Sequence, residues 1–228
     1  MSIKVQAEVF AILIILAVLL SFFILVSRAV QKADVTQKPK GILLLGIIYY
    51  EFIHNLVRDN MGKKAVHVYG PYIGALALFL VVSNLSGLTG IATPTANYSV
   101  TLSLALITFV LIQRTKIKTN GIKAYLHGFI EPIVPFIIPN IFGTIAPLIS
   151  MSLRLFGNLT SGSVIMTLVY VFTGFLSSFV PWLGQFNFIG VALAPVLHAY
   201  FDVFSGLIQT YIFISLTTIF VGNELPQE

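Results

Sequence analysis

Hydrophobic residues gather into long uninterrupted runs that are separated by short polar segments. The first run, residues 9–27, has no charged side chain and is about the length of one bilayer span at ~1.5 Å rise per residue. Further runs cover residues 69–88, 98–113, 132–175 and 189–221. We therefore predict an all-α polytopic membrane protein, a single membrane domain over residues 1–228 with about five membrane helices.

The run at 132–175 is too long for one upright span. As a straight helix it would measure ~66 Å, more than twice the ~30 Å thickness of the hydrocarbon core. It must therefore tilt strongly, bend, or fold as a hairpin. Prolines offer places to bend, at Pro132, Pro135, Pro139 and Pro147.

Composition agrees with a membrane class and excludes several others. The chain is 57% hydrophobic and only 9% charged, whereas a soluble domain carries roughly 25% charged residues. It has no cysteine, which excludes disulfides, thiolate catalysis and Cys-ligated zinc. It also lacks a Gly-rich phosphate loop of the Walker type. We expect no cofactor, no metal and no catalysis by the chain itself.

Positive charge is concentrated in two segments, 28–64 and 114–123, which hold eleven of the thirteen Lys and Arg residues. This bias predicts that both segments face the cytoplasm, with residues 41–64 at or near the interface. The loops at 89–99 and 177–187 have no Lys or Arg and are expected outside. An odd number of crossings then places the N-terminus outside and the C-terminus in the cytoplasm. We expect contact with lipid rather than nucleic acid, in a bacterial plasma membrane.

Between residues 132 and 222 the only Lys, Arg, Asp or Glu residues are Arg154 and Asp202. A charge at the bilayer centre costs roughly 2.5–3.5 kcal/mol even on the lenient insertion scale, so such residues usually mark an ion path. A buried Asp can become neutral, but an arginine with a pKa above ~12 cannot. Arg154 must therefore meet an anion or water.

Polar residues recur at helical spacing around both charges. One stripe consists of Ser150, Arg154, Asn158 and Ser161, and the other of His198, Asp202, Ser205 and Gln209. Gly157 and Gly162 leave the first helix thin, so that a partner helix can approach closely. Two polar stripes on two apolar helices are typical of the walls of an aqueous or proton-relaying path.

A purely structural interpretation is also open. Arg154 and Asp202 could form a buried ion pair, the other polar side chains could join helices by hydrogen bonds, and His198 could be satisfied by backbone. Placing an arginine in mid-membrane, however, costs more free energy than an interhelical hydrogen bond contributes. The ion path is therefore the favoured interpretation for Arg154.

The segment "SLRLFGNLTSG" at 152–162 resembles the signature of subunit a of F-type ATP synthases. Similar likeness extends to "SNLSGL" at 83–88, "PTAN" at 94–97 and "LIQTYIF" at 207–213. The resemblance implies that Arg154 is the essential arginine, that Gln209 is the glutamine that supports it, and that Asn158 is a polar channel position.

The chain also departs from that family's pattern. Ser163 stands where many relatives have a carboxylate, and Asp202 stands where they have His or Glu. The first half-channel is therefore expected to depend on Asp202, His198 and water. For the second half-channel the candidates are Glu131 and Glu51.

The resemblance implies a stator subunit that passes ions through two half-channels to the carboxylates of a rotating c-ring, and that also meets peripheral-stalk b subunits. It implies coupling of ion flow to ATP synthesis or hydrolysis elsewhere in the complex. The alternative is a stand-alone secondary ion transporter or channel. The sequence leaves open whether the ion is H⁺ or Na⁺.

Overall fold

The structure is a computed structural model that describes residues 7–34, 38–179 and 186–226, and in this part of the chain it is built from helices without a strand. The prediction of an all-α protein is confirmed. Five of the described helical stretches are long and apolar enough to cross a membrane. They cover Ala7–Gln31, Ala65–Thr89, Tyr98–His127, Val134–Ser178 and Phe188–Gly222.

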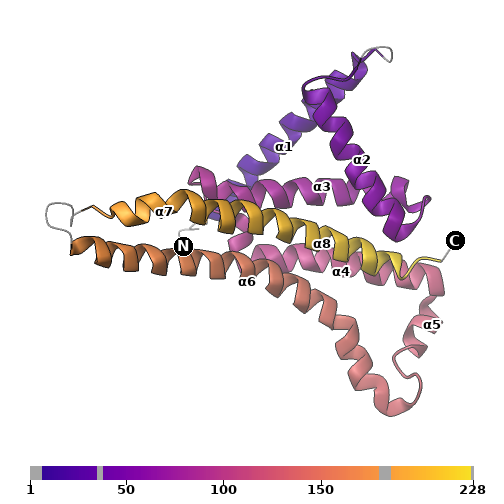
Figure 1. Ribbon diagram of the computed structural model, residues 1–228. Coiled ribbons are helices and arrows are strands. Elements are labelled where there is room, and N and C mark those ends of the chain that lie inside the picture. Colours follow the sequence, from indigo (N-terminus) through magenta and orange to yellow (C-terminus); the bar gives the residue numbers. More distant parts are fainter. Residues whose placement is uncertain (1–6, 35–37, 180–185, 227–228) are drawn as a thin grey trace, which may run out of the picture.

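Helices α1 (Ala7–Gln31) and α2 (Ile42–Met61) form a V that projects from one side of the molecule (Figure 1). Most of the large apolar side chains of α1 are exposed, as expected of a surface that faces lipid. Helix α2 packs on α3 and α8. It carries Glu51, Arg58 and Asp59, and with these three charges it is not one of the five candidate spans. Its place at the membrane interface stays a prediction.

The centre of the bundle is formed by α3 (Ala65–Leu85), α4 (Tyr98–Asn120) and α8 (Ser205–Gly222). Buried apolar side chains such as Ile73, Leu80 and Phe213 pack between them. Two hydroxyl pairs join α3 to α4, Tyr69 with Thr115 at 3.0 Å and Tyr72 with Thr108 at 3.2 Å. Because lipid removes the hydrophobic drive between helices, close packing and such bonds hold the bundle together.

Helix α6 (Ile137–Ser178) resolves the alternatives for the long apolar run. It is one continuous helix of 42 residues, so no hairpin forms. It is bent rather than straight (Figure 1), and Pro147 lies inside it. Its first part diverges from α4, and the short helix α5 (Ile122–His127) links the diverging ends.

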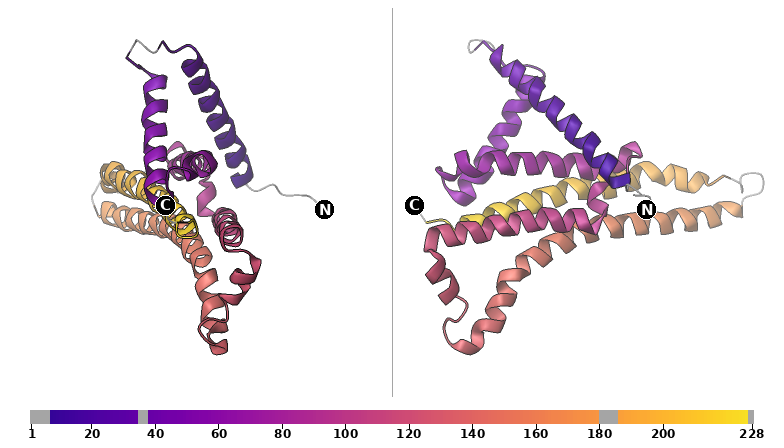
Figure 2. Two further views of the ribbon diagram at one scale, coloured as in Figure 1. Left: turned by 90° about the vertical axis from the view of Figure 1, so that its right-hand side faces the viewer. Right: turned by 180° about the vertical axis from the view of Figure 1, so that it is seen from behind.

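The last span is a chain of three segments, α7 (Phe188–His198), the π-helical segment η4 (Ala199–Phe204) and α8. It returns antiparallel to α6, and both lie on one flank of the bundle in the end-on view of Figure 2. Asn187 fixes the start of this return. Its side chain accepts a bond from Gly190 N and donates to Tyr170 O and Thr173 Oγ1.

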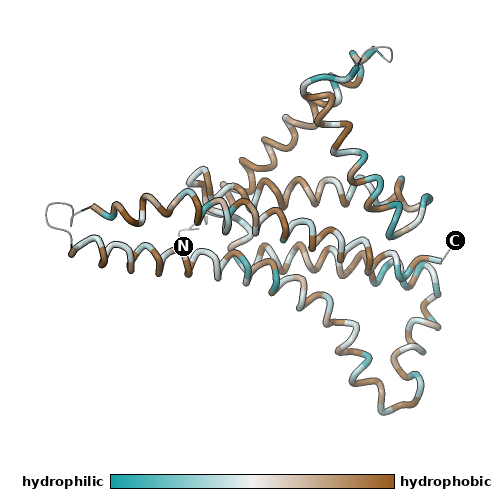
Figure 3. Tube along the Cα trace, in the orientation of Figure 1, coloured by the Kyte–Doolittle hydropathy of each residue, from teal (hydrophilic) through white to brown (hydrophobic). Residues whose placement is uncertain are grey.

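Hydrophilic residues gather towards the helix ends (Figure 3). The end of α2, the end of α4 and the C-terminal end of α8 lie together at one end of the bundle (Figure 1). There Lys116 and Glu224 form an ion pair with 3.4 Å between Nζ and Oε1. Much of the basic charge of the two basic segments is thus gathered at this end. The loop expected outside at 177–187 lies at the opposite end, but its residues 180–185, like the N-terminal residues 1–6, fall outside the described part.

Candidate functional site

Arg154 lies about midway along α6, and its side chain is exposed. Its one hydrogen bond among the described residues is weak, from Nη2 to Ser150 Oγ at 3.5 Å. Within the described chain Arg154 forms no ion pair. The internal Arg154–Asp202 pair is therefore not formed, and the guanidinium faces outward.

The two polar stripes meet across the antiparallel helices. Ser205 Oγ donates to Asn158 Oδ1 at 3.0 Å. One turn further along α6, a Cβ added to Gly162 would lie 3.4 Å from the ring of Phe201. Phe201 lies one turn before Ser205 on the last span. Both pairs follow the same antiparallel register. Continuing that register by one turn in the other direction brings Arg154 level with Gln209.

Gln209 is only 5% exposed, and its Nε2 has no partner among the described residues. A buried amide donor left unpaired costs about 1–3 kcal/mol. A buried polar side chain without a partner calls for an explanation other than packing. The neighbouring turn is held by Asn84, which is 2% exposed and donates to Gly206 O at 3.0 Å and to Thr210 Oγ1 at 3.1 Å.

His198 and Asp202 form the second polar cluster. His198 Nδ1 lies 2.5 Å from Asp202 Oδ2, and His198 Nε2 lies 3.2 Å from the hydroxyl of Tyr170 on α6. Imidazole has two nitrogens and can take a proton on one while releasing it from the other. Tyr170, His198 and Asp202 thus form a continuous row of hydrogen-bonding groups.

Two further serines are exposed on α6, Ser161 of the first stripe and Ser163, which lies on the opposite face of the helix from Arg154. Ser161 and Ser163 donate to carbonyl oxygens of their own helix, Asn158 O and Thr160 O respectively. Their hydroxyl oxygens remain able to accept a further hydrogen bond. Ser161 therefore extends the polar stripe of Arg154, and Ser163 is a separate polar position.

The two carboxylates named for the second half-channel lie apart. Glu51 is exposed on α2, whereas Glu131 lies in the turn between α5 and α6 on the other side of the bundle (Figure 1) and contacts His127 at 2.8 Å. Neither contacts the two polar stripes through a bond among the described residues.

Sequence reasoning missed three polar residues that position the site: Asn84, Tyr170 and Asn187. Each makes a hydrogen bond between two separate helical segments, which periodicity along one helix does not reveal. The signal for Asn84 was an amide at the end of an apolar span, within "SNLSGL". Among the described residues no three His, Asp or Glu side chains come together in a way that could hold a metal ion.

The sequence matches the protein family described as ATP synthase A chain over residues 9–222. It is 35% identical to ATP synthase subunit a of Mycoplasma genitalium over 223 residues, which are 92% of this chain and 76% of that protein. It is 30% identical to subunit a of Oceanobacillus iheyensis, over 84% of this chain and 80% of that protein. A third relative, 33% identical over 78% of this chain and 62% of that protein, is the sodium ion specific subunit a of Propionigenium modestum.

The family match spans all five candidate membrane helices. It includes Arg154 and both polar stripes, and it displaces the stand-alone transporter as an interpretation. On this match the chain belongs to the ATP synthase A chain family, whose members are the non-catalytic, ion-translocating membrane subunit of the F-type ATP synthase.

Proposed function

We propose that Arg154 is the fixed cation of the rotary motor and that it faces the carboxylates of a rotating c-ring. One observation carries the proposal: the guanidinium is exposed on an apolar flank with no anionic partner in the described chain. A charge in that position needs an anion or water, and a partner helix that presents a carboxylate supplies the anion. Gly157 lies nearby with nothing within 4 Å of where its Cβ would be, which leaves room for close approach.

In this mechanism a ring carboxylate loses its ion near Arg154 and is held there by the opposite charge. Rotation then moves it away, and it is recharged from the other half-channel. An arginine cannot lose its proton at physiological pH, so it keeps the carboxylate ionised and repels ions that would leak between the half-channels. Each ion that crosses at 100 mV releases ~2.3 kcal/mol, so several are needed for each ATP.

The first half-channel runs along the facing stripes of α6 and the last span. His198 and Asp202 exchange the ion at its outer part, and Ser205 with Asn158 leads towards Gln209 and Arg154. The bond between Ser205 and Asn158 and the common register support this order. Ser150 and Ser161 lie on the face of α6 that carries Arg154 and faces the ring, whereas Ser163 lies on the opposite face of the helix. Glu131 and Glu51 remain the two candidate acids for the second half-channel.

In the membrane, the end that carries the basic segments faces the cytoplasm, with the C-terminus there and the N-terminus outside. The exposed apolar faces of α1 contact lipid and the peripheral-stalk b subunits. The host membrane is a bacterial plasma membrane. No nucleic acid takes part.

The test is ATP-driven ion uptake by inverted vesicles that carry the assembled complex. Arg154→Ala is expected to abolish uptake while the complex still assembles, because the fixed cation is lost. Arg28→Ala removes an exposed arginine far from the stripes and serves as the matched control. If Arg154→Ala pumps as well as Arg28→Ala at equal assembly, Arg154 is structural and the proposal fails.

A further inference from the structure

A groove runs between α3 and α4, from the basic end of the bundle towards its middle. It consists of three adjoining cavities of about 660, 430 and 290 Å³. The outer two share Tyr69 and Thr115 as walls, and the inner two share Tyr72 and Ile107. We call this continuous space the α3–α4 groove. It forms because α3 and α4 each pack on α8 more than on one another.

The outer part of the α3–α4 groove is basic. Arg114 and Lys118 of α4 line it, and Lys64 at the start of α3 lines the outermost cavity. No Asp or Glu is among the described residues that line the three cavities. This end of the groove therefore attracts an anion.

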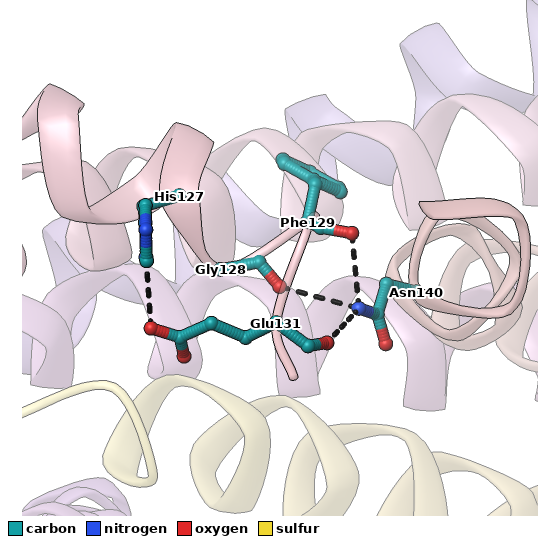
Figure 4. Close-up of polar contacts among 5 residues, drawn as sticks. All are labelled: His127, Gly128, Phe129, Glu131 and Asn140. Atoms are coloured by element: carbon teal, nitrogen blue, oxygen red, sulfur yellow. Dashed lines mark hydrogen bonds and ion pairs between the residues drawn. The ribbon is translucent and has the colours of Figure 1, made fainter. Parts of the chain in front are cut away.

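Arg114 and Lys118 differ from neighbouring basic groups in having no acidic partner. Both are exposed, and within the described part of the chain neither forms an ion pair. Two basic groups near the same end of the bundle do have partners: Lys116 with Glu224, and His127 with Glu131 (Figure 4). The uncompensated positive charge is thus located at the groove.

The inner part of the groove is apolar. Its tyrosine hydroxyls are already used in bonds between the two helices, Tyr69 with Thr115 at 3.0 Å and Tyr72 with Thr108 at 3.2 Å. The innermost cavity is lined by aliphatic and aromatic side chains of α1, α3 and α4. A hydrocarbon chain is favoured there, whereas a charged group is not.

The length of the groove matches one leaflet of a bilayer. From Lys118 to Ile107 it follows ~16 Å of α4, and half of the ~30 Å hydrocarbon core is ~15 Å. Val68 and Val110 on its walls are 71% and 57% exposed, so the groove is open towards lipid. Its occupant therefore needs an anionic group at one end and a long apolar chain behind it.

We propose that the α3–α4 groove binds one anionic phospholipid from the leaflet at the basic end of the bundle. The phosphate lies between Arg114 and Lys118, and one acyl chain follows the groove to the innermost cavity beside α1. Arginine can hold two phosphate oxygens at once, and lysine adds a second positive charge. A zwitterionic lipid is disfavoured, because its own cation would meet two cations that have no acidic partner.

The lipid site is separate from the ion path. No residue of the two polar stripes lines the groove, so this inference goes beyond the proposed function. A lipid bound here fills the space between two spans that pack little on one another, and it stabilises the folded chain by binding only to that state.

The test uses assembled complex in vesicles of phosphatidylcholine that contain a trace of phosphatidylglycerol with a photoactivatable group at the end of one acyl chain. After irradiation, the attachment sites are mapped by mass spectrometry. The double variant Arg114→Gln with Lys118→Gln removes both cations of the site, and glutamine keeps a good helix propensity. The matched control is Arg28→Gln with Lys123→Gln, which changes the charge equally at two exposed positions outside the groove.

We expect the phosphatidylglycerol probe to attach to the segment around Ile107 in the wild type and in the control variant. In the Arg114→Gln and Lys118→Gln variant, attachment should fall ~30-fold at low probe fractions. That factor is ~2 kcal/mol, from ~1 kcal/mol for each basic group near an anionic headgroup and 1.4 kcal/mol for each tenfold. Added salt should weaken attachment in the wild type and leave this double variant unchanged.

Three results would overturn the proposal. One is equal attachment in the two double variants. Another is a phosphatidylcholine probe, with the same photoactivatable group, that attaches around Ile107 as strongly as the phosphatidylglycerol probe. The third is attachment to a helix of another subunit and not to the segment around Ile107, because a protein partner then covers the groove.

Discussion

Asn84 offers a sharp test of how the site is held in place. The fully buried side chain joins α3, the loop after it, and α8 beside Gln209. It donates to Gly206 O and Thr210 Oγ1, and it accepts from Thr95 Oγ1 at 2.8 Å. Asn84→Ala removes all three bonds without replacing any of them.

The loss can be estimated partner by partner. Thr95 is fully buried, and its hydroxyl left without an acceptor costs about 1–3 kcal/mol. An interhelical bond in a membrane protein contributes ~0.6 kcal/mol on average, so the lost contact with α8 adds little. Thr210 keeps its own bond to Gly206 O at 3.0 Å. The sum is about 2 kcal/mol, which for a chain of this size lowers the melting temperature by ~4–8 °C.

The assay is thermal release of this subunit from the detergent-solubilised complex. Asn55→Ala is the control, because Asn55 is exposed on α2 and such substitutions usually change stability by less than ~0.5 kcal/mol. Asn84→Ala should also lower ion uptake, because α8 is free to rotate next to Gln209. If the two variants melt within experimental error of one another, the cross-helix bonds of Asn84 carry no stability and the reasoning is refuted.

Three further predictions concern a charge, a close contact and a buried phenol. Asp202→Asn should reduce ATP-driven ion uptake while leaving assembly intact, as measured in inverted vesicles; unchanged uptake would remove it from the path. Gly222→Ala should destabilise the complex in the thermal assay, because the new Cβ would lie 2.1 Å from Asn60 O; Gly143→Ala, with nothing within 4 Å, is the control and should be silent. Burial raises the pKa of Tyr49 above its ordinary 10.0, so the unfolded chain deprotonates first and stability should fall as pH rises through 10; Tyr49→Phe should flatten that fall in melting curves.

The apolar runs of the sequence were enough to predict the class and the number of candidate spans. A bilayer leaves few options, because each backbone polar group must be paired inside a helix and a span needs a set length of apolar residues. The two charges that are costly to place in a membrane could also be found from the sequence, since Arg154 and Asp202 stand alone in the apolar carboxyl half. Helical spacing was enough to place Ser150 and Asn158 on the face of Arg154.

The shape of the long helix could not be predicted from the sequence. Proline positions allowed a bend or a hairpin equally, and only the packing of α6 against α4 and α8 selects the continuous bent helix. The contacts between stripes were also hidden, because periodicity along one helix says nothing of the register against another. The structure pairs Ser205 with Asn158 and His198 with Tyr170.

The sequence by itself therefore determined the membrane environment of this protein, its helices, and the charged residues whose burial in a membrane costs enough free energy to indicate a function. What only the tertiary structure decided is which of them meet. Asp202 turns to His198 rather than to Arg154, which leaves the arginine facing outward. The cavity lined by Gln113 of α4 and Asn140 of α6 likewise exists only because α6 bends away from α4 and the end of α8 returns to it. Such geometry depends on distances between segments far apart in the chain, and local chemistry does not set them.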